Sequence, residues 1–170
     1  MMKKFLQYTS KLKHLPRTGW LRHNISFPES VAAHSWQMAM IALKLSQTEE
    51  KYDFNKVIKL CLCHDMGESV IGDITPNDSR YKDKKQMEQE AVDKIAQDGN
   101  IPEIKALFME YEEALTPEAK LANDLDKLDM YVQSLDYENK YPQKDLSEFR
   151  QSAVAAIKTD IGKALLKELV

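Results

Sequence analysis

Hydrophobic residues recur along nearly the whole chain at the three-to-four-residue spacing of amphipathic helices, and no stretch sustains the two-residue alternation of a strand. The pattern predicts an all-α fold. We expect a single-domain helical bundle over residues 1–170, because no linker or internal repeat divides the chain. Helices are expected over residues 2–13, 31–47, 54–65, 82–98, 102–114, 117–139 and 144–169, the last with a break near Thr159-Asp160.

Start signals mark three of these helices. Ser30 and Asp53 are good N-cap residues, and Thr116 precedes a proline at the first helical position. The helix over 54–65 carries apolar residues around its whole circumference, which predicts burial on all sides. Residues 15–29 have no helical pattern, and we expect a long irregular segment of the kind that binds a ligand or acts as a lid.

The composition is that of a globular protein with a substantial core, since 43% of the 170 residues are hydrophobic and 30% are charged. The net charge of −3 and the lack of a basic run argue against a nucleic-acid partner. No apolar run approaches the roughly 20 residues of a membrane span, and the first residues lack the apolar core of a signal peptide. We therefore expect a cytoplasmic protein with no membrane partner.

The two cysteines, Cys61 and Cys63, lie two residues apart in an apolar helix. On a helix they point about 200° apart, which disfavours a mutual disulfide. They are interpreted as small core residues of a reduced protein.

Candidate chemistry is concentrated at His64-Asp65, which closes an apolar run where a buried helix is expected. Burying an unpaired carboxylate costs several kcal/mol, so such a group normally pairs with a cation or binds a metal. His34 lies on the apolar face of its own predicted helix, with Met38 and Ile41 on the next turns. Each histidine alone is also compatible with a core imidazole that is bonded to a carbonyl. Together, imidazole nitrogens and carboxylate oxygens indicate a divalent metal ion.

A fourth ligand is expected from the helix over 117–139, but periodicity does not select it. Leucines mark the main inward stripe, and Asp124 and Asp129 flank it on opposite sides. Asp126 points to a second strip that holds small residues. By spacing alone Asp124, Asp126 and Asp129 are all candidates, and a solvated acidic face is an equal alternative.

With these residues in place, the chain resembles the HD-domain metal-dependent phosphohydrolases, named for the pattern His…His-Asp…Asp, and within them the 5′-deoxynucleotidase branch. The likeness covers most of residues 10–140, whereas the helical segment 141–170 carries no motif. The matching stretches are Pro16-Arg17-Thr18-Gly19-Trp20, Pro28-Glu29-Ser30-Val31-Ala32-Ala33-His34, residues 64–74 and Ala122-Asn123-Asp124-Leu125-Asp126-Lys127-Leu128-Asp129-Met130.

The resemblance implies a role for each matching residue. Glu68 is implied as the catalytic carboxylate that acts on the attacking water, and Asp73 as the contact to the sugar. Arg17 is implied as the contact to the phosphate, and Trp20 matches an aromatic substrate contact whose spacing from the arginine varies. The implied metal ligands are His34, His64, Asp65 and Asp126.

The resemblance also bears on the number of ions. Its two-metal members carry extra histidines after the His-Asp pair, and here the remaining histidines, His14 and His23, both precede it. One divalent ion is therefore expected, with Co, Mn, Mg, Zn, Fe and Ni all open. Similar proteins form dimers, so a homodimer is a further expectation.

The leading hypothesis is a metal-dependent 5′-deoxynucleotidase that converts deoxyribonucleoside 5′-monophosphates to deoxynucleoside and phosphate. One alternative is an HD phosphohydrolase of another nucleotide or a small phosphate ester. A second alternative is a metal-stabilised helical binding module without turnover, although such a module has no need of Glu68 and Asp73 beside the ligands.

Overall fold

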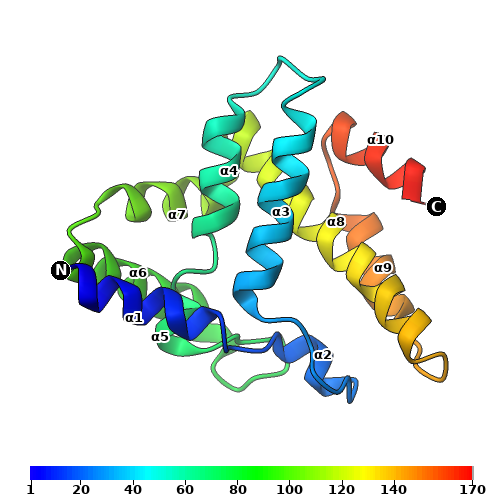
Figure 1. Cartoon of the computed structure of the whole chain (residues 1–170), viewed down its shortest axis with the longest axis horizontal. Coiled ribbons are helices and arrows are strands. Elements are labelled where there is room, and N and C mark those ends of the chain that lie inside the picture. The colour runs from blue at the N-terminus through cyan, green and yellow to red at the C-terminus, as the bar shows by residue number, and fades with distance from the viewer. Residues whose placement is uncertain (170) are drawn as a thin grey trace.

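The computed structural model describes residues 1–169 and shows an all-α bundle, which confirms the expected fold class. Helices α3 and α4 lie side by side, and the long helix α8 packs against both (Figure 1). The helices are α1 (Met2–Leu12), α2 (Thr18–Arg22), α3 (Val31–Leu45), α4 (Phe54–Cys63), α5 (Glu68–Ile71), the 3₁₀ helix η1 (Tyr81–Asp83), α6 (Lys84–Gly99), α7 (Glu103–Glu113), α8 (Pro117–Lys140), α9 (Ser147–Ala156) and α10 (Asp160–Leu169).

The core has a main part and two smaller parts. The main apolar cluster joins α3, α4, α7 and α8, and α10 packs against it. A second cluster lies under α1, between α6 and α7. The third gathers Trp20, Ile25, Tyr137 and Leu146, and it fixes the segment that carries α2. The centre of the bundle is therefore formed by the helices that carry the candidate ligands.

The expected helix starts are confirmed. Ser30 Oγ accepts the backbone N–H of Ala33 at 3.1 Å, and Asp53 Oδ1 accepts that of Lys56 at 3.2 Å. Thr116 Oγ1 accepts the N–H of the third helical residue of α8 at 3.2 Å. The expected break near Thr159-Asp160 is also present, because α9 ends at Ala156 and α10 begins at Asp160.

Residues 15–29 are more ordered than their pattern predicts, because they contain α2. A helix of five residues is too short to be stable alone. Here the backbone N–H of Thr18 donates to Asp73 Oδ2, and Trp20 packs on Phe149 with a ring-centroid separation of 4.3 Å. Tertiary contacts with residues far along the chain thus stabilise a turn that local propensity does not specify.

The prediction that the helix over 54–65 is buried on all sides was wrong. Leu62 is 47% exposed, and Cys63 is half-buried. Helix α4 packs against α3, α7 and α8, and among residues 1–169 no helix covers its remaining side. Cys61 is buried and both cysteines are free thiols, as expected.

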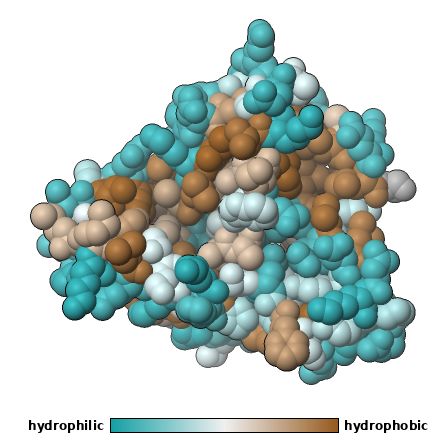
Figure 2. All heavy atoms as spheres, in the orientation of Figure 1, coloured by the Kyte–Doolittle hydropathy of each residue, from teal (hydrophilic) through white to brown (hydrophobic). Residues whose placement is uncertain are grey.

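Three exposed hydrophobic residues of α3 form an apolar strip: Trp36, Met40 and Leu43. Their spacing of four and three residues places them on one face of the helix, and Trp36 is 61% exposed. Figure 2 shows hydrophobic side chains gathered over the part of the surface that α3, α4 and α10 form. Within residues 1–169, no helix is both long and apolar enough to cross a bilayer.

Helix α10 approaches α8 so closely that only glycine fits at position 162. A Cβ atom there would lie 2.5 Å from Asp124 Oδ2 and 2.9 Å from Ile157 Cγ2. We expect Gly162→Ala to lower the free energy of unfolding by about 1–3 kcal/mol, because the two helices must separate to accommodate the methyl group. Urea denaturation measures the effect. Lys163→Ala, at an exposed position of the same helix, is the control, and equal stability of the two variants would contradict the packing argument.

Candidate metal centre and active site

Three helices bring the predicted ligands together at the centre of the bundle. His34 lies on α3 and is fully buried, while His64 and Asp65 follow directly after α4. Asp126 lies in the first half of α8. Because α3, α4 and α8 pack against one another, residues distant in sequence face a common point.

The donor atoms are close enough for one ion. His34 Nε2 lies 3.2 Å from Asp126 Oδ1 and 4.0 Å from Asp65 Oδ2, and His64 Nε2 lies 3.0 Å from Asp65 Oδ2. Ligand atoms of His34, His64 and Asp126 all lie within 4.8 Å of one another. This spacing matches donors that each bond a shared ion at about 2.1 Å.

Contacts on the outer side turn both imidazoles toward that point. His34 Nδ1 lies 2.6 Å from Asp129 Oδ2, and His64 Nδ1 lies 2.9 Å from the carbonyl oxygen of Cys61. A carbonyl only accepts, so Nδ1 of His64 carries a hydrogen, and Nε2 is the nitrogen that faces the centre. The arrangement is the usual one for histidines that bind a metal through Nε2.

The electrostatics of the centre favour added positive charge. Burial raises the pKa of Asp65, but His64 and Arg17 outweigh burial and hold that pKa well below its usual range. Burial likewise opposes ionisation of Asp126, and Lys127 and His34 lower its pKa well below normal. The two carboxylates are therefore ionised, and together they form a site suited to a divalent cation.

The surroundings of His34 also favour a positive charge. Burial and the charge of Arg17 lower the pKa of His34, yet the carboxylates of Asp126 and Asp129 raise it to about 9. Its Nε2 atom is buried and makes no well-formed hydrogen bond with any residue in 1–169. The carboxylates that favour a positive charge on this ring would equally favour a metal ion at Nε2, of the class that binds mixed nitrogen and oxygen donors.

Glu68 begins α5, close to the predicted ligands. The turn between α4 and α5 is tight, since the N–H of Glu68 donates to the carbonyl of Asp65 at 3.1 Å. Glu68 is 2% exposed, its Oε2 has no hydrogen-bond partner within residues 1–169, and its Oε1 lies 3.7 Å from Lys84 Nζ. Burial, and then the charges of Asp65 and Asp73, raise the pKa of Glu68 well above its usual value.

Arg17 approaches the same carboxylates from the segment before α2. Its guanidinium lies 3.3 Å from Asp65 Oδ2 and 3.9 Å from Asp126 Oδ1. Burial lowers the pKa of Arg17, but the nearby carboxylates, Asp65 first, raise it above normal. The planar donors of the guanidinium are therefore charged at the edge of the centre.

Asp73 and Trp20 lie in the wall around the centre. Asp73 accepts the N–H of Thr18 at 2.5 Å, and its carbonyl accepts the Thr18 hydroxyl at 2.8 Å. Trp20 is only 2% exposed, and its Nε1 donates to Glu29 Oε1 at 2.9 Å. Trp20 thus offers little free surface, and its packing role is the more prominent one in this structure.

A cavity of about 620 Å³ opens on the centre, which is a size suited to a small molecule. Its lining includes all of the predicted site residues except the fully buried His34: Arg17, Trp20, His64, Asp65, Glu68, Asp73 and Asp126. The structure therefore brings these predicted residues to one cavity.

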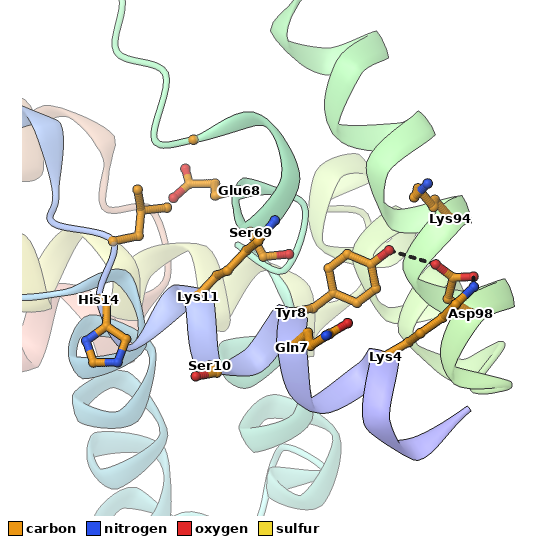
Figure 3. Close-up of a pocket in the computed structure, with 12 residues that line it drawn as sticks. Lys4, Gln7, Tyr8, Ser10, Lys11, His14, Glu68, Ser69, Lys94 and Asp98 are labelled. Atoms are coloured by element: carbon orange, nitrogen blue, oxygen red, sulfur yellow. Dashed lines mark hydrogen bonds and ion pairs between the residues drawn. The ribbon is translucent and has the colours of Figure 1, made fainter.

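A second cavity, of about 920 Å³, lies on the other side of Glu68, beside α1 and α5 (Figure 3). Lysines and His14 line it, and Lys4 and Tyr8 both bond to Asp98 at 2.8 Å. None of the four predicted ligands is part of its lining. Glu68 thus lies between two cavities, and only the first contains the candidate centre.

Comparison with known proteins identifies the family. A family model described as an HD domain matches residues 9–169. The chain belongs to the HD-domain family. The HD-domain match extends through the C-terminal segment, where the sequence carries no motif of its own.

Relatives are similar to this HD domain over most of their length. The 5′-deoxynucleotidase hdd1 of Schizosaccharomyces pombe is 43% identical over 155 residues, which cover 85% of this chain and 77% of the relative. The 5′-deoxynucleotidase HDDC2 of Dictyostelium discoideum is 41% identical over 144 residues, covering 79% and 76%. The crystal structure of the PH0347 protein from Pyrococcus horikoshii OT3 is 34% identical, with a TM-score of 0.84 over 99% of this chain and 96% of that chain.

The HD-domain structure separates the three aspartates of α8 that spacing left as alternatives. Asp124 accepts the backbone N–H groups of Lys158 and Thr159, at 3.0 and 2.7 Å, and so holds the start of α10. Asp129 contacts Nδ1 of His34, and Asp126 faces its Nε2. A solvated acidic face is excluded for Asp124 and Asp129, which are 3% and 0% exposed.

Three residues of the cavity were not anticipated from the sequence. Lys84 lies between Glu68 and Glu88, and Lys127 Nζ lies 2.7 Å from Asp126 Oδ2. The ring of Tyr111 lies 4.8 Å from that of His64, and its hydroxyl lies 3.4 Å from Asp126 Oδ2. Lysines on polar helices and a tyrosine on an amphipathic helix carry no local signal of such a role.

Proposed function

We propose that this HD domain is a metal-dependent 5′-deoxynucleotidase, which hydrolyses deoxyribonucleoside 5′-monophosphates to deoxynucleoside and phosphate. The observation that carries the proposal is that one histidine, two aspartates, a buried glutamate and an arginine line one cavity, with a second, fully buried histidine directly behind them. The names of the curated relatives support the same activity.

One divalent ion is proposed, held by His34, His64, Asp65 and Asp126. When bound, such an ion neutralises phosphate charge and lowers the pKa of water, which this slow hydrolysis requires. Two imidazoles and two carboxylates fit Co, Mn, Fe, Zn, Ni or Mg, and the donor set does not choose among them.

The protein's own groups are proposed to supply the remaining steps. Arg17 binds the phosphate oxygens, and its position beside Asp65 orients the phosphorus toward the centre. Glu68 accepts a proton from the attacking water. Its buried, unpartnered Oε2 atom supports this role, and its raised pKa suits a group that accepts a proton and later releases it.

The preference for a deoxy sugar is proposed to come from Asp73 and the segment that it holds. Asp73 is bonded to Thr18 at both its carboxylate and its carbonyl. This pairing joins the first residue of α2 to the segment after α5, and Arg17, Gly19 and Asp73 from these parts of the chain line the cavity. A ribose would bring an additional hydroxyl against this tight junction. Trp20 supports the same wall from behind.

The test is phosphate release across a panel of nucleotides. We expect release from dAMP, dGMP, dCMP, dTMP and dUMP, with ribonucleoside monophosphates about 10²-fold poorer in kcat/KM, the discrimination that shape alone gives against an added hydroxyl. Release should stop with EDTA and return with added Mn²⁺ or Co²⁺.

Other results on the same panel of nucleotides would support one of the two alternative functions. Release from nucleoside triphosphates alone would point to a different HD phosphohydrolase. Metal binding without release from any phosphate ester would point to a binding module. The homodimer, the cytoplasmic location and the lack of a nucleic-acid partner stay predictions, and light scattering on the purified protein measures the first of them.

A further inference from the structure

Asp129 is a buried acid next to the candidate centre to which neither the resemblance nor the proposed mechanism gives a role. We propose that Asp129 is the positioning residue of the metal centre: its carboxylate accepts the Nδ1 hydrogen of His34 and so aims Nε2 at the ion. The inference rests on the metal site of the proposed function.

The geometry follows from one turn of α8. Asp126 and Asp129 are three residues apart, so their side chains lie on neighbouring positions of the same helix face. Asp126 Oδ1 lies 3.2 Å from Nε2 of His34, and Asp129 Oδ2 lies 2.6 Å from Nδ1. The imidazole is therefore held at both nitrogens by a single rigid element.

Asp129 is poorly placed to be a ligand itself, although spacing allowed it. The residue is fully buried and does not line the cavity, whereas Asp126, Asp65 and His64 do. Carboxylate and imidazole atoms of Glu29, His34 and Asp129 also form a cluster within 4.8 Å. In that cluster, however, Glu29 Oε1 accepts from Trp20 and Asp129 Oδ2 faces Nδ1. The Nδ1 side is thus closed, and the Nε2 side faces the cavity residues.

The contact matters energetically because it is short, charged and buried. A carboxylate that accepts from a ligand histidine fixes the tautomer and increases the basicity of the coordinating nitrogen. Removing such an outer partner typically weakens metal binding by about 10–100-fold. The negative charge, and not merely a hydrogen-bond acceptor, is the feature to be tested.

The test compares Asp129→Asn with Asp124→Asn, using Co²⁺ as the probe. An asparagine side chain at position 129 has nearly the same shape and still offers an oxygen to Nδ1, but it lacks the charge. Asp124 is the matched control because it is a buried acid on the same helix whose hydrogen-bond partners, Lys158 and Thr159, belong to the segment before α10 and not to the centre. We expect Asp129→Asn to weaken Co²⁺ binding by about 10–100-fold and to shift the visible spectrum of bound Co²⁺.

The control should behave in the opposite way. Asp124→Asn places an amide N–H₂ near the N–H of Thr159, so the melting temperature of the metal-free protein should fall while Co²⁺ affinity and spectrum stay at wild-type values. Equal Co²⁺ binding by Asp129→Asn and wild type would overturn the inference and leave the metal centre standing. Equal weakening in both variants would also overturn it, since the loss would then reflect a loosened fold. A wild-type protein that binds no Co²⁺ would overturn the metal centre and the inference together.

Discussion

Replacing Asp126 with alanine should leave a folded protein that neither retains a divalent ion nor releases phosphate above the level of the metal-free wild type. Asp126 Oδ1 is the carboxylate oxygen that lies 3.2 Å from Nε2 of His34. Its removal takes away one of the proposed ligands and a negative charge that offsets Arg17. Because loss of an outer partner of a metal ligand already costs about 10–100-fold in affinity, loss of a ligand should cost more than about 100-fold.

Metal content after purification, measured by elemental analysis, and phosphate release on a deoxynucleoside monophosphate test this prediction. Asp136→Ala is the matched control, since Asp136 is an exposed acid on the same helix. The control should keep both metal and activity. An Asp126→Ala protein with a full complement of metal would remove Asp126 from the ligand set and return the choice to the other acids of α8.

Replacing Glu68 with glutamine should give the opposite combination, a protein that keeps its metal and loses its rate. We expect kcat to fall by about 10²–10⁴-fold, the range that a positioned acid–base group supplies. Glutamine preserves the shape of the buried side chain but cannot accept a proton from water. The thermal stability should not fall, because burial disfavours the ionised carboxylate that the substitution removes.

Steady-state kinetics, with metal content measured on the same samples, check the prediction for Glu68. Glu112→Gln is the control, because Glu112 is another carboxylate of the same cavity lining, and its kcat should remain near that of the wild type. Glu68→Ala should show the same loss as Glu68→Gln. Full activity in either Glu68 variant would contradict the proposed mechanism, whereas loss of metal would place Glu68 among the ligands.

The two predictions together separate binding from chemistry. Asp126 is proposed to act through the ion, and Glu68 is proposed to act on the water. A site that fails both tests in the same way, with metal and rate lost together, would favour a shared structural role. The substrate panel then decides which phosphate ester the intact centre accepts.

Much of this architecture can be read from local patterns. Ser30, Asp53 and Thr116 begin helices because their side chains satisfy free N–H groups within three residues, so a short stretch of sequence contains all the interacting atoms. Burial of the His64 region could also be predicted, because an apolar helix leads directly into the pair.

Other features depend on contacts that no local pattern encodes. Helix α2 exists because Trp20 packs on Phe149 and Thr18 bonds to Asp73. Leu62 is exposed because no helix covers that side of α4 within residues 1–169. Both outcomes are set by where distant helices pack, which periodicity within one helix does not determine.

The aspartates of α8 show which features the sequence predicts and which depend on the tertiary structure. The sequence by itself determined an all-α bundle and the presence of two histidines, a His-Asp pair and several acids that suit a divalent ion. Only the tertiary structure decided that Asp124 holds the two residues before α10, that Asp126 faces Nε2 of His34 and that Asp129 contacts its Nδ1. The physical reason is that these roles depend on which side of α8 meets α3 and which side meets α10, and helix packing fixes that rotation.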